Sequence, residues 1–326
     1  MAWKILKENH PISSKLLEHE ALKELDGVQE LVDWSRFERL LKDIHSSRKG
    51  ERAWPPLMMF KALLLQSWYQ LSDPALEKQL VRDLLFRRFV GLPLSESVPD
   101  HSSLWRFRKK LEGELMGTLL IELNEQLAEQ GLYIKEGAVS IIDASVIEAK
   151  QCRPNKNKQG KPTQDTEAGW NVKKASNGKK TSTYGFKAHI NVDEDGFIKT
   201  TDFTAGNVHD SLNFIDLLEG DESAAYADSA YQSKKHREYL EEKNIKDCLT
   251  RRAYRNKPLT KEDKQFNRIN SGTRSIVERV FGVLKQHYGM AKARYLGKIR
   301  NQTRFELMCV AHNLKRGVSI QQESCV

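Results

Sequence analysis

Residues 138–143, A-V-S-I-I-D, mark the point at which the chain changes from helical to β-strand periodicity. The apolar, β-branched residues of this short run are typical of a buried strand. The run ends in an aspartate, so Asp143 places a carboxylate at the end of the first predicted strand. The elements on either side of this strand then define the fold.

Two alternating segments follow and predict a β-hairpin. Aromatic and aliphatic side chains occupy every second position of residues 184–192, and residues 197–203 return as a partner strand. The sequence D-E-D-G at residues 193–196 supplies the turn. Helical and strand patterns then alternate along the chain. We predict helices over residues 210–218 and 233–243, and strands over residues 224–228 and 245–250.

This order of elements predicts an α/β fold. A strand, a hairpin and then alternating helices and strands are the pattern of a ribonuclease H-like domain, in which a mixed sheet carries flanking helices. Residues 1–135 instead show helical periodicity and almost no strand signal. We therefore predict an all-helical N-terminal domain over residues 1–135, a ribonuclease H-like domain over residues 136–316 and a C-terminal tail over residues 317–326.

The N-terminal domain is expected to contain four helices, and the last of them begins with a basic cluster. Phosphate contact by this helix end, in the manner of an expanded helix-turn-helix, is one interpretation; the alternative is a solvated face beside a hydrophobic stripe. The predicted helices span residues 34–44, 57–71, 73–90 and 104–130. The basic residues of the last helix are Arg106, Arg108, Lys109 and Lys110.

The charge balance indicates a polyanionic partner. The chain has 53 Lys and Arg residues against 44 Asp and Glu, a formal net charge of +9, which favours binding to nucleic acid. Ribosomal or membrane-surface proteins can share that balance. Two basic segments, residues 150–180 and 251–257, flank the predicted hairpin and the strands that follow it, and we expect Arg251 and Arg252 in the second to contact phosphates. Solvated basic loops are the alternative.

The cysteines and the hydropathy of the chain indicate the cellular compartment in which we expect the protein. The four cysteines are scattered without C-x-x-C spacing, which is typical of reduced thiols in the cytoplasm and not of a zinc site or a disulfide framework. The first residues lack the apolar core of a signal peptide, and no run approaches 18 uninterrupted apolar residues. We therefore expect neither secretion nor a membrane span.

Residues 271–288 predict an amphipathic helix with a charged stripe beside its apolar face. Arg274, Glu278 and Lys285 fall within about 40° of one another on a helix of 3.6 residues per turn. A carboxylate on this half-buried border can bind a metal ion while the two cations hold an anionic substrate. The alternative is a surface pair between Arg274 and Glu278, which stabilises a helix only slightly. The apolar positions are Ile276, Val277, Val280, Phe281 and Leu284.

Two further carboxylates end predicted strands. Asp143 ends the first strand and Asp228 ends the strand at residues 224–228, and we expect these two strands to lie side by side. Each aspartate can also be read as a turn or cap residue. Together with Glu278 they would offer three hard oxygen ligands, which favour Mg²⁺ or Mn²⁺. Two such ions would activate a water or a 3′-hydroxyl and stabilise the leaving oxygen of a phosphodiester.

Several motifs give the sequence a specific resemblance. I-I-D-A-S-V-I-E-A at residues 141–149, G-N-V-H-D-S at 206–211, Y-A-D-S-A-Y at 226–231 and R-S-I-V-E-R-V-F-G-V-L-K at 274–285 resemble the DDE transposases of bacterial insertion sequences, closest to the insertion-sequence-five family. F-K-A-L-L-L-Q and D-H-S-S-L-W-R-F-R resemble the helical N-terminal module of that family. The similarity extends over roughly residues 30–316.

The resemblance implies roles for individual residues. Asp143, Asp228 and Glu278 match the metal-binding triad of the family. Arg274 and Lys285 match the basic partners in its Y-x2-R-x3-E-x6-K signature. Mg²⁺ or Mn²⁺, as two ions, is the implied cofactor. The implied reaction is cleavage at the ends of a mobile element followed by 3′-hydroxyl attack on target DNA.

The sequence departs from the family signature at one position and matches the family at one further pair of residues. Ser271 stands where the family signature has tyrosine, which removes whatever substrate contact that ring makes. His209 lies in a family H-D pair and is expected near the substrate; its neighbour Asp210 can instead be a helix cap.

The implied reaction also predicts partners and a location. Both ends of an element must be joined at one place, so we expect at least a dimer on double-stranded DNA, in the bacterial cytoplasm at the nucleoid. Two other functions remain open from the sequence. One is a transposase-derived DNA-binding protein without catalysis, and the other is a structure-specific nuclease without strand transfer.

Overall fold

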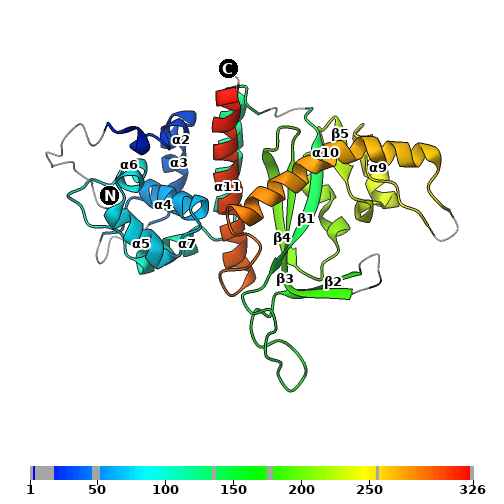
Figure 1. Cartoon of the computed structure of the whole chain (residues 1–326), viewed down its shortest axis with the longest axis horizontal. Helices are drawn as coiled ribbons and strands as arrows, with labels where there is room; N and C mark the ends of the chain where they lie inside the picture. Colours follow the sequence, from blue (N-terminus) through cyan, green and yellow to red (C-terminus); the bar gives the residue numbers. More distant parts are fainter. Residues whose placement is uncertain are drawn as a thin grey trace. The chain divides into compact units, whose positions relative to one another are not determined.

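The chain forms two compact units in a computed structural model (Figure 1). The first unit comprises Met1–Leu132 and Glu306–Val326, and the second comprises Tyr133–Phe305. The C-terminal segment therefore groups with the N-terminal helices from Glu306 onward, whereas the sequence suggested a boundary after residue 316. The structure describes residues 3, 18–45, 52–133, 137–174, 178, 180–254 and 257–323.

The described residues of the first unit are mainly helical, as predicted. Its central helix, α4, carries side chains that are buried on all of its faces, because it is rich in Leu, Met and Phe. Phe60 on α4 stacks on Phe37 with ring centroids 5.9 Å apart. The elements before residue 132 are η1 (Glu20–Leu22), α2 (Asp26–Leu31), α3 (Trp34–Leu41), α4 (Pro56–Trp68), α5 (Asp73–Arg82), α6 (Leu84–Val90), α7 (His101–Lys110) and α8 (Leu115–Glu129).

The single helix predicted over residues 73–90 is wrong, because the chain breaks at Asp83. This residue is extended, with φ −106° and ψ 116°, and its carboxylate accepts hydrogen bonds from the backbone N–H groups of Leu85 and Phe86. Aspartate is favoured in this N-cap geometry. It therefore ends α5 and begins α6.

The long helix predicted over residues 104–130 is also two helices. Helix α7 begins at His101, after the Asp100 side chain accepts a hydrogen bond from the backbone N–H of Ser103. Between α7 and α8 the chain turns through Gly113, whose φ of +102° is accessible mainly to glycine. The basic residues of this segment consequently belong to α7 alone.

The last helix, α11 (Lys298–Glu323), was not predicted as an element. Its second half packs in the first unit, where the Trp68 indole donates a hydrogen bond to the carbonyl of Ala311 at 2.9 Å. Gly317 permits a close approach, since a Cβ there would lie 2.9 Å from the side chain of Leu31 and 3.0 Å from that of Leu127. Residues 317–323 are thus helical, whereas a tail was expected.

The second unit is a six-stranded mixed sheet with flanking helices, which confirms the predicted fold class. The strand order is β2-β3-β1-β5-β6, and β4 pairs with β3. The β3–β4 hairpin is confirmed with antiparallel register. The strands are β1 (Ser140–Glu148), β2 (Gly169–Lys174), β3 (Lys180–Val192), β4 (Ile198–Ala205), β5 (Ala224–Ala227) and β6 (Lys246–Asp247).

Helical elements cover the sheet. Helix α9 (Lys234–Glu242) and a group of short 3₁₀ turns pack on a cluster that includes Ile142, Phe214 and Leu240. Helix α10 (Lys261–Gln286) packs against β1, β3 and β5, and Figure 1 shows it crossing β1. This helix begins earlier than predicted, because Thr260 and Asp263 form a capping box at its N-terminus.

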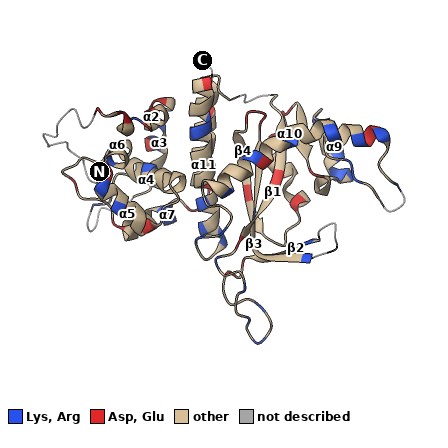
Figure 2. Cartoon of the chain, viewed as in Figure 1, with Lys and Arg blue, Asp and Glu red and all other residues tan. Residues whose placement is uncertain are grey.

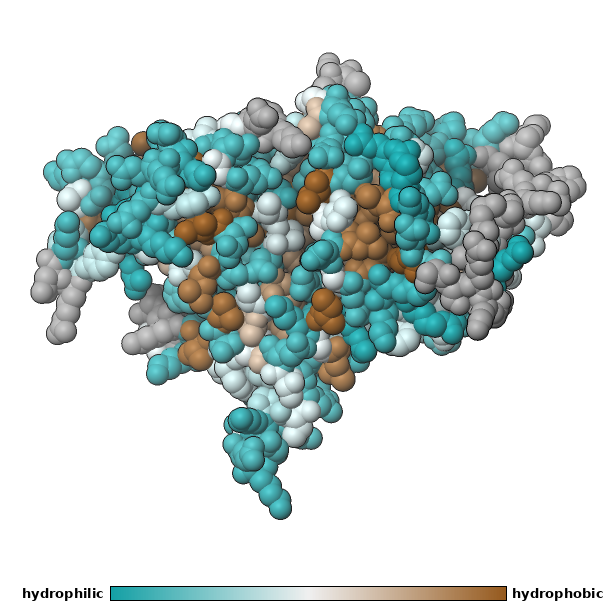
Figure 3. Space-filling model, turned by 180° about the vertical axis from the view of Figure 1, so that it is seen from behind, coloured by the Kyte–Doolittle hydropathy of each residue, from teal (hydrophilic) through white to brown (hydrophobic). Residues whose placement is uncertain are grey.

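Two local predictions in the second unit differ from the structure. The helix expected over residues 210–218 is a pair of 3₁₀ turns, η2 (Asp210–Asn213) and η3 (Ile215–Leu217). The basic stretch after residue 150, expected to be entirely loop, contains strand β2. Figure 3 colours the loop between β1 and β2 as hydrophilic.

None of the helices in the described part of the chain combines the length and apolarity needed to cross a membrane.

Candidate active site

Strands β1 and β5 bring Asp143 and Asp228 to neighbouring positions. The two strands are parallel and adjacent, as predicted, and Ile142 pairs with Ala227 in their register. Asp143 follows Ile142 within β1, which continues to Glu148, so the prediction that Asp143 ends its strand is wrong. Asp228 directly follows Ala227, the last residue of β5. Asp228 then caps the 3₁₀ turn η4 (Ser229–Tyr231) by accepting a hydrogen bond from the backbone N–H of Ser229.

Asp143 lies in a partly buried acidic environment. Burial raises the pKa of Asp143 to about 6, and the negative charges of Asp228 and Asp210 act in the same direction. A hydrogen bond from the Ala144 backbone and the positive charge of Arg274 oppose this rise. Three carboxylates and one guanidinium therefore interact electrostatically around Asp143 of β1, beside the end of β5. A divalent cation would stabilise the ionised form of such a group.

Asp210 is held at this site by a lysine that the sequence analysis did not single out. Lys187 of β3 is buried, and its Nζ lies 2.7 Å from Oδ1 of Asp210 and 2.7 Å from the carbonyl oxygen of Val208. Asp210 is the first residue of η2, whose cap is His209. The ion pair fixes the start of η2 beside the aspartates. Its sequence signal was a lysine among alternating apolar residues of a strand.

Tyr231 is a second residue that the sequence analysis missed. Its side chain is 1% exposed, and its hydroxyl has no hydrogen-bond partner among the described residues. Burial raises the pKa of this phenol, and the negative charges of Asp143, Asp210 and Asp228 raise it further. An unpaired buried hydroxyl is costly, and it is placed here among carboxylates. Its sequence signal was its place at the end of the Y-A-D-S-A-Y motif, three residues after Asp228.

Helix α10 contributes the charged stripe predicted from the sequence. The Arg274 guanidinium lies 3.4 Å from the Thr250 hydroxyl, and its charge acts on Asp143. Burial and the charge of Lys173 lower the pKa of Lys285, whereas Asp143 raises it. Both cations therefore act on the same carboxylate. Figure 2 shows the acidic positions of β1 and the basic positions of α10.

Glu278 lies on this stripe, one helical turn after Arg274, and its side chain is exposed. In the ranges that the structure describes, no hydrogen bond or ion pair engages it. Its carboxylate also does not form a compact cluster with Asp143 and Asp228, because no three ligand atoms of these residues lie within 4.8 Å of one another. The two aspartates are coupled electrostatically to each other, whereas the described structure does not gather Glu278 with them into one compact group of ligands.

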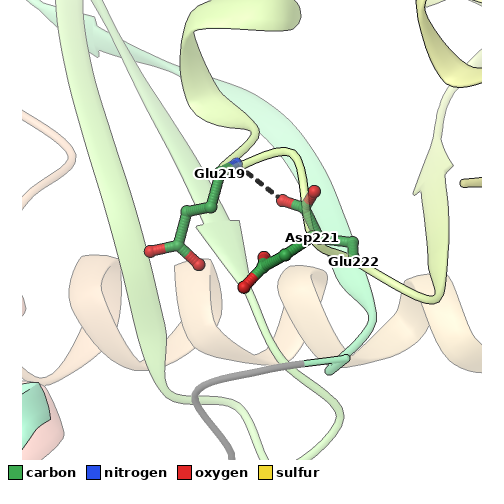
Figure 4. Close-up of side chains that lie close together, drawn as sticks. All are labelled: Glu219, Asp221 and Glu222. Atoms are coloured by element: carbon green, nitrogen blue, oxygen red, sulfur yellow. Dashed lines mark hydrogen bonds between the residues drawn. The ribbon is translucent and has the colours of Figure 1, made fainter. Parts of the chain in front are cut away.

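A different acidic group is compact but is neutralised within the protein. Ligand atoms of Glu219, Asp221 and Glu222 lie within 4.8 Å of one another (Figure 4). The buried Glu222 carboxylate accepts hydrogen bonds from the Ser140 hydroxyl and from the backbone N–H groups of Glu219 and Gly220.

The buried Lys199 compensates the charge of this group. Its Nζ lies 2.8 Å from Glu219 and 3.9 Å from Glu222. These contacts give the cluster a structural explanation that involves no ion. Asp143 differs, because the cations that act on it are Arg274, which is partly exposed, and Lys285, which is exposed.

The other residues predicted to lie near the substrate differ in their exposure and in their interaction partners. His209 is exposed, and its Nδ1 lies 2.7 Å from the Ser211 hydroxyl. Arg251 forms an ion pair with Asp247 at 2.8 Å and lies over the Phe266 ring at 4.6 Å. Arg252 is exposed. Arg252 therefore offers a more available cation than Arg251.

The four basic residues predicted to bind DNA on α7 are not equivalent. Arg108 is 4% exposed, and its guanidinium binds Asp73 and Gln66. It stabilises the helical unit and is withdrawn from the expected DNA surface. Arg108 comes four residues after the buried Leu104 and three before the buried Leu111, and this spacing places it on the same face as both. The exposed members are Arg106, Lys109 and Lys110.

The described cysteines agree with the expected thiols. Cys152 is exposed, Cys248 and Cys309 are buried, and all three are free. Cys325 lies outside the described residues.

The mixed sheet and its order define the second unit as a ribonuclease H-like domain. Residues 135–314 match the family model described as a transposase DDE domain, and residues 12–110 match the model of a transposase domain named DUF772. The first match covers more than half of the chain, and the chain belongs to the DDE transposase family. This membership implies DNA as a partner and a divalent metal ion as a cofactor.

Proposed function

We propose that the protein is an insertion-sequence transposase, of the insertion-sequence-five type, that cleaves the ends of its element and joins their 3′-hydroxyls to target DNA. The observation that carries this proposal is the adjacency of Asp143 and Asp228 on parallel strands beneath a helix bearing Glu278. Family membership supports the same reaction. The N-terminal residues 1–135 are proposed as the DNA-binding and assembly domain, and residues 136–316 as the catalytic domain.

Asp143, Asp228 and Glu278 are the proposed metal ligands. The donor set fits Mg²⁺ or Mn²⁺, since it consists of carboxylate oxygens without a thiolate. Two bound ions would activate the attacking oxygen and stabilise the leaving oxygen. Glu278 is exposed on one turn of α10, so its side chain can reorient while the two aspartates stay fixed by their strands.

Basic residues around the carboxylates are proposed to hold the DNA backbone. Arg274 and Lys285 border the acidic site from α10, and each is electrostatically linked to Asp143. His209 and Arg252 are both exposed. Arg251 is proposed to act mainly by fixing its loop, because it is already paired with Asp247. Phosphate contacts of this kind position DNA without reading its sequence.

The working complex is proposed to contain at least two copies of the chain on double-stranded DNA, because two element ends must be cut and joined at one target. Ser271, which replaces the signature tyrosine, is exposed near the middle of α10. The described structure gives no account of this replacement.

The function is tested by incubating the full chain with its own flanking DNA and Mg²⁺, then mapping cut and joined products. Cleaved ends covalently joined to target DNA are expected. Cutting without joining would instead identify a structure-specific nuclease. DNA binding without either product would identify a non-catalytic DNA-binding protein.

Tyr231→Phe is expected to slow DNA cleavage by about tenfold or more without lowering stability. The lost hydroxyl would bond a charged group in the loaded site, and such bonds contribute about 1.5–3 kcal/mol. In the free protein the hydroxyl has no partner among the described residues, so its removal leaves no group unpaired. Cleavage rate and thermal unfolding are measured together, and Tyr239→Phe on α9 is the control. A lower melting temperature with an unchanged rate would show a purely structural role.

A further inference from the structure

The first unit contains a cavity of about 380 Å³ that the proposed reaction does not use. This volume is in the range of small-molecule binding sites. It is separate from the carboxylates, since all of its lining residues belong to the helical unit. Helix α7 supplies one wall, and the segments that follow α3 and precede α4 supply another. Its basic and aromatic lining residues are His45, Arg52, Trp54, Arg106, Phe107 and Lys110.

The cavity lining is strongly basic. Arg52, Arg106 and Lys110 contribute three positive charges, and none of the described lining residues carries a carboxylate. A concave surface with charges of one sign concentrates counter-ions more effectively than a flat one. Among the described residues, one carboxylate lies within ion-pair distance of these cations, that of Asp100, whose Oδ1 is 4.0 Å from Arg106. The positive charge is therefore mostly uncompensated within the described part of the unit.

The cations retain donors for a ligand. Lys110 donates to the Ile44 carbonyl at 3.2 Å and lies 2.9 Å from Nδ1 of His45, which leaves one of its three N–H groups. Arg106 bonds the Ser103 hydroxyl at 3.2 Å through one nitrogen. Arg52 is exposed and has no hydrogen bond or ion pair with another described residue. Burial and the Lys110 charge lower the pKa of His45, which is consistent with its acting as an acceptor.

An aromatic wall completes the cavity. Phe107 is 2% exposed, and its ring lies 6.1 Å from that of His45. Trp54 lines the same cavity and is partly exposed. Aromatic rings beside cations are the combination that binds nucleotides, because the base packs on a ring while the phosphate meets the charges. An inorganic anion alone would leave the aromatic wall unused.

We propose that this cavity binds one nucleotide through its phosphate, with the base or sugar against the aromatic wall. The proposal deepens the proposed function, because it rests on DNA being the partner and assigns the helical unit a specific contact with it. The occupant is taken to be a nucleotide within a DNA strand. A free nucleotide has the same chemistry, and the experiment separates the two.

The test measures binding of a labelled oligonucleotide of the element end to the full chain by fluorescence anisotropy at several salt concentrations. Arg52→Gln and Arg106→Gln are compared with Lys78→Gln, which removes an exposed charge from α5 of the same unit. Each cavity variant is expected to weaken binding about threefold to tenfold and to reduce the salt slope by about 1, the value for one lost phosphate contact. Lys78→Gln is expected to resemble the wild type.

A second arm uses deoxyadenosine monophosphate and inorganic phosphate as probes in calorimetry. Binding of the mononucleotide to wild type and its loss in Arg52→Gln would support a nucleotide site. If the variants lost mononucleotide binding but kept oligonucleotide affinity and salt slope, a free nucleotide would be the occupant and the DNA assignment would be overturned. Equal binding of both probes by Arg52→Gln and Lys78→Gln would overturn the site itself.

Folding and catalysis provide independent controls. Arg52 has no partner among the described residues, so Arg52→Gln is expected to unfold at the wild-type temperature. Asp143→Asn is expected to keep the oligonucleotide affinity of the wild type. Full affinity and salt slope in Arg52→Gln, together with inactive Asp143→Asn, would overturn the cavity while leaving the proposed reaction intact. An active Asp143→Asn would affect only the proposed reaction.

Discussion

Asp143→Asn is expected to lower the rate of element-end cleavage by at least about a thousandfold, which corresponds to about 4 kcal/mol of transition-state stabilisation. The substitution keeps the size of the side chain and removes the charge that a divalent ion requires. Asp143 is coupled to Asp228, Asp210 and Arg274, so its loss affects the centre of the proposed site. The measurement is single-turnover cleavage of end DNA in Mg²⁺, with the exposed Asp216→Asn as the control.

A stability measurement distinguishes lost chemistry from misfolding. Burial raises the pKa of Asp143 from its usual value near 4 to about 6, so the metal-free fold loses stability as the pH rises from about 4 to about 6, and the full loss is present above that range. At pH 8 the asparagine variant is therefore expected to unfold at the same temperature or a higher one. Mg²⁺ is expected to raise the melting temperature of the wild type more than that of the variant. Retained cleavage, or a less stable variant, would contradict this role.

Lys199→Ala is expected to lower the free energy of unfolding of the second unit by about 3–5 kcal/mol. The Lys199 side chain is fully buried between Glu219 and Glu222, and the Glu222 side chain is fully buried as well. Removing the lysine leaves a buried carboxylate without its compensating charge. Chemical denaturation followed by circular dichroism measures the change.

Two further variants test whether the loss of stability in Lys199→Ala comes from the unpaired buried charge. Lys234→Ala removes an exposed lysine that pairs with Glu238 on α9, and little change in stability is expected. Adding Glu222→Gln to Lys199→Ala is expected to recover part of the loss, because no unpaired buried charge remains. Equal effects of Lys199→Ala and Lys234→Ala would show that the acidic cluster does not depend on Lys199. In that case a bound cation would be the alternative explanation.

The sequence predicted the fold class where hydrophobic periodicity is strong. The run ending at Asp143 and the alternation in residues 184–192 identified the central strands, and the parallel pairing of β1 with β5 was predicted correctly. Strand β2 was missed because it lies at the end of the sheet path in a polar stretch, where Trp170 and Val172 are partly or largely exposed. Burial therefore does not impose an alternating pattern on it.

Helix boundaries were predicted less well, although their signals are present. Asp83 precedes a new apolar run, and Gly113 interrupts the segment predicted as one helix, yet apolar spacing continues across both breaks. Thr260 and Asp263 likewise form a capping box that the predicted start at residue 271 ignored. Local cap chemistry ended or began these helices where hydrophobic spacing alone gave no boundary.

The residues of the candidate site also fall into two groups, those that the sequence predicted and those that only the structure identified. The carboxylates and the α10 stripe follow from sequence spacing and strand order, whereas Lys187 and Tyr231 depend on the tertiary structure. A lysine in a strand and a tyrosine after a turn are common, and only burial beside Asp210 and Asp228 gives them significance. Arg108 shows the reverse case, because its basic character suggested DNA contact until burial and pairing with Asp73 gave it another role.

The central claim is that Asp143, Asp228 and Glu278 together hold the catalytic metal. Anomalous diffraction from crystals grown with end DNA and Mn²⁺ locates the ion directly. We predict peaks roughly 2.2 Å from carboxylate oxygens of Asp143 and Asp228, with Glu278 turned toward the same ion. A peak at Glu219 and Glu222 with none between Asp143 and Asp228 would contradict the claim.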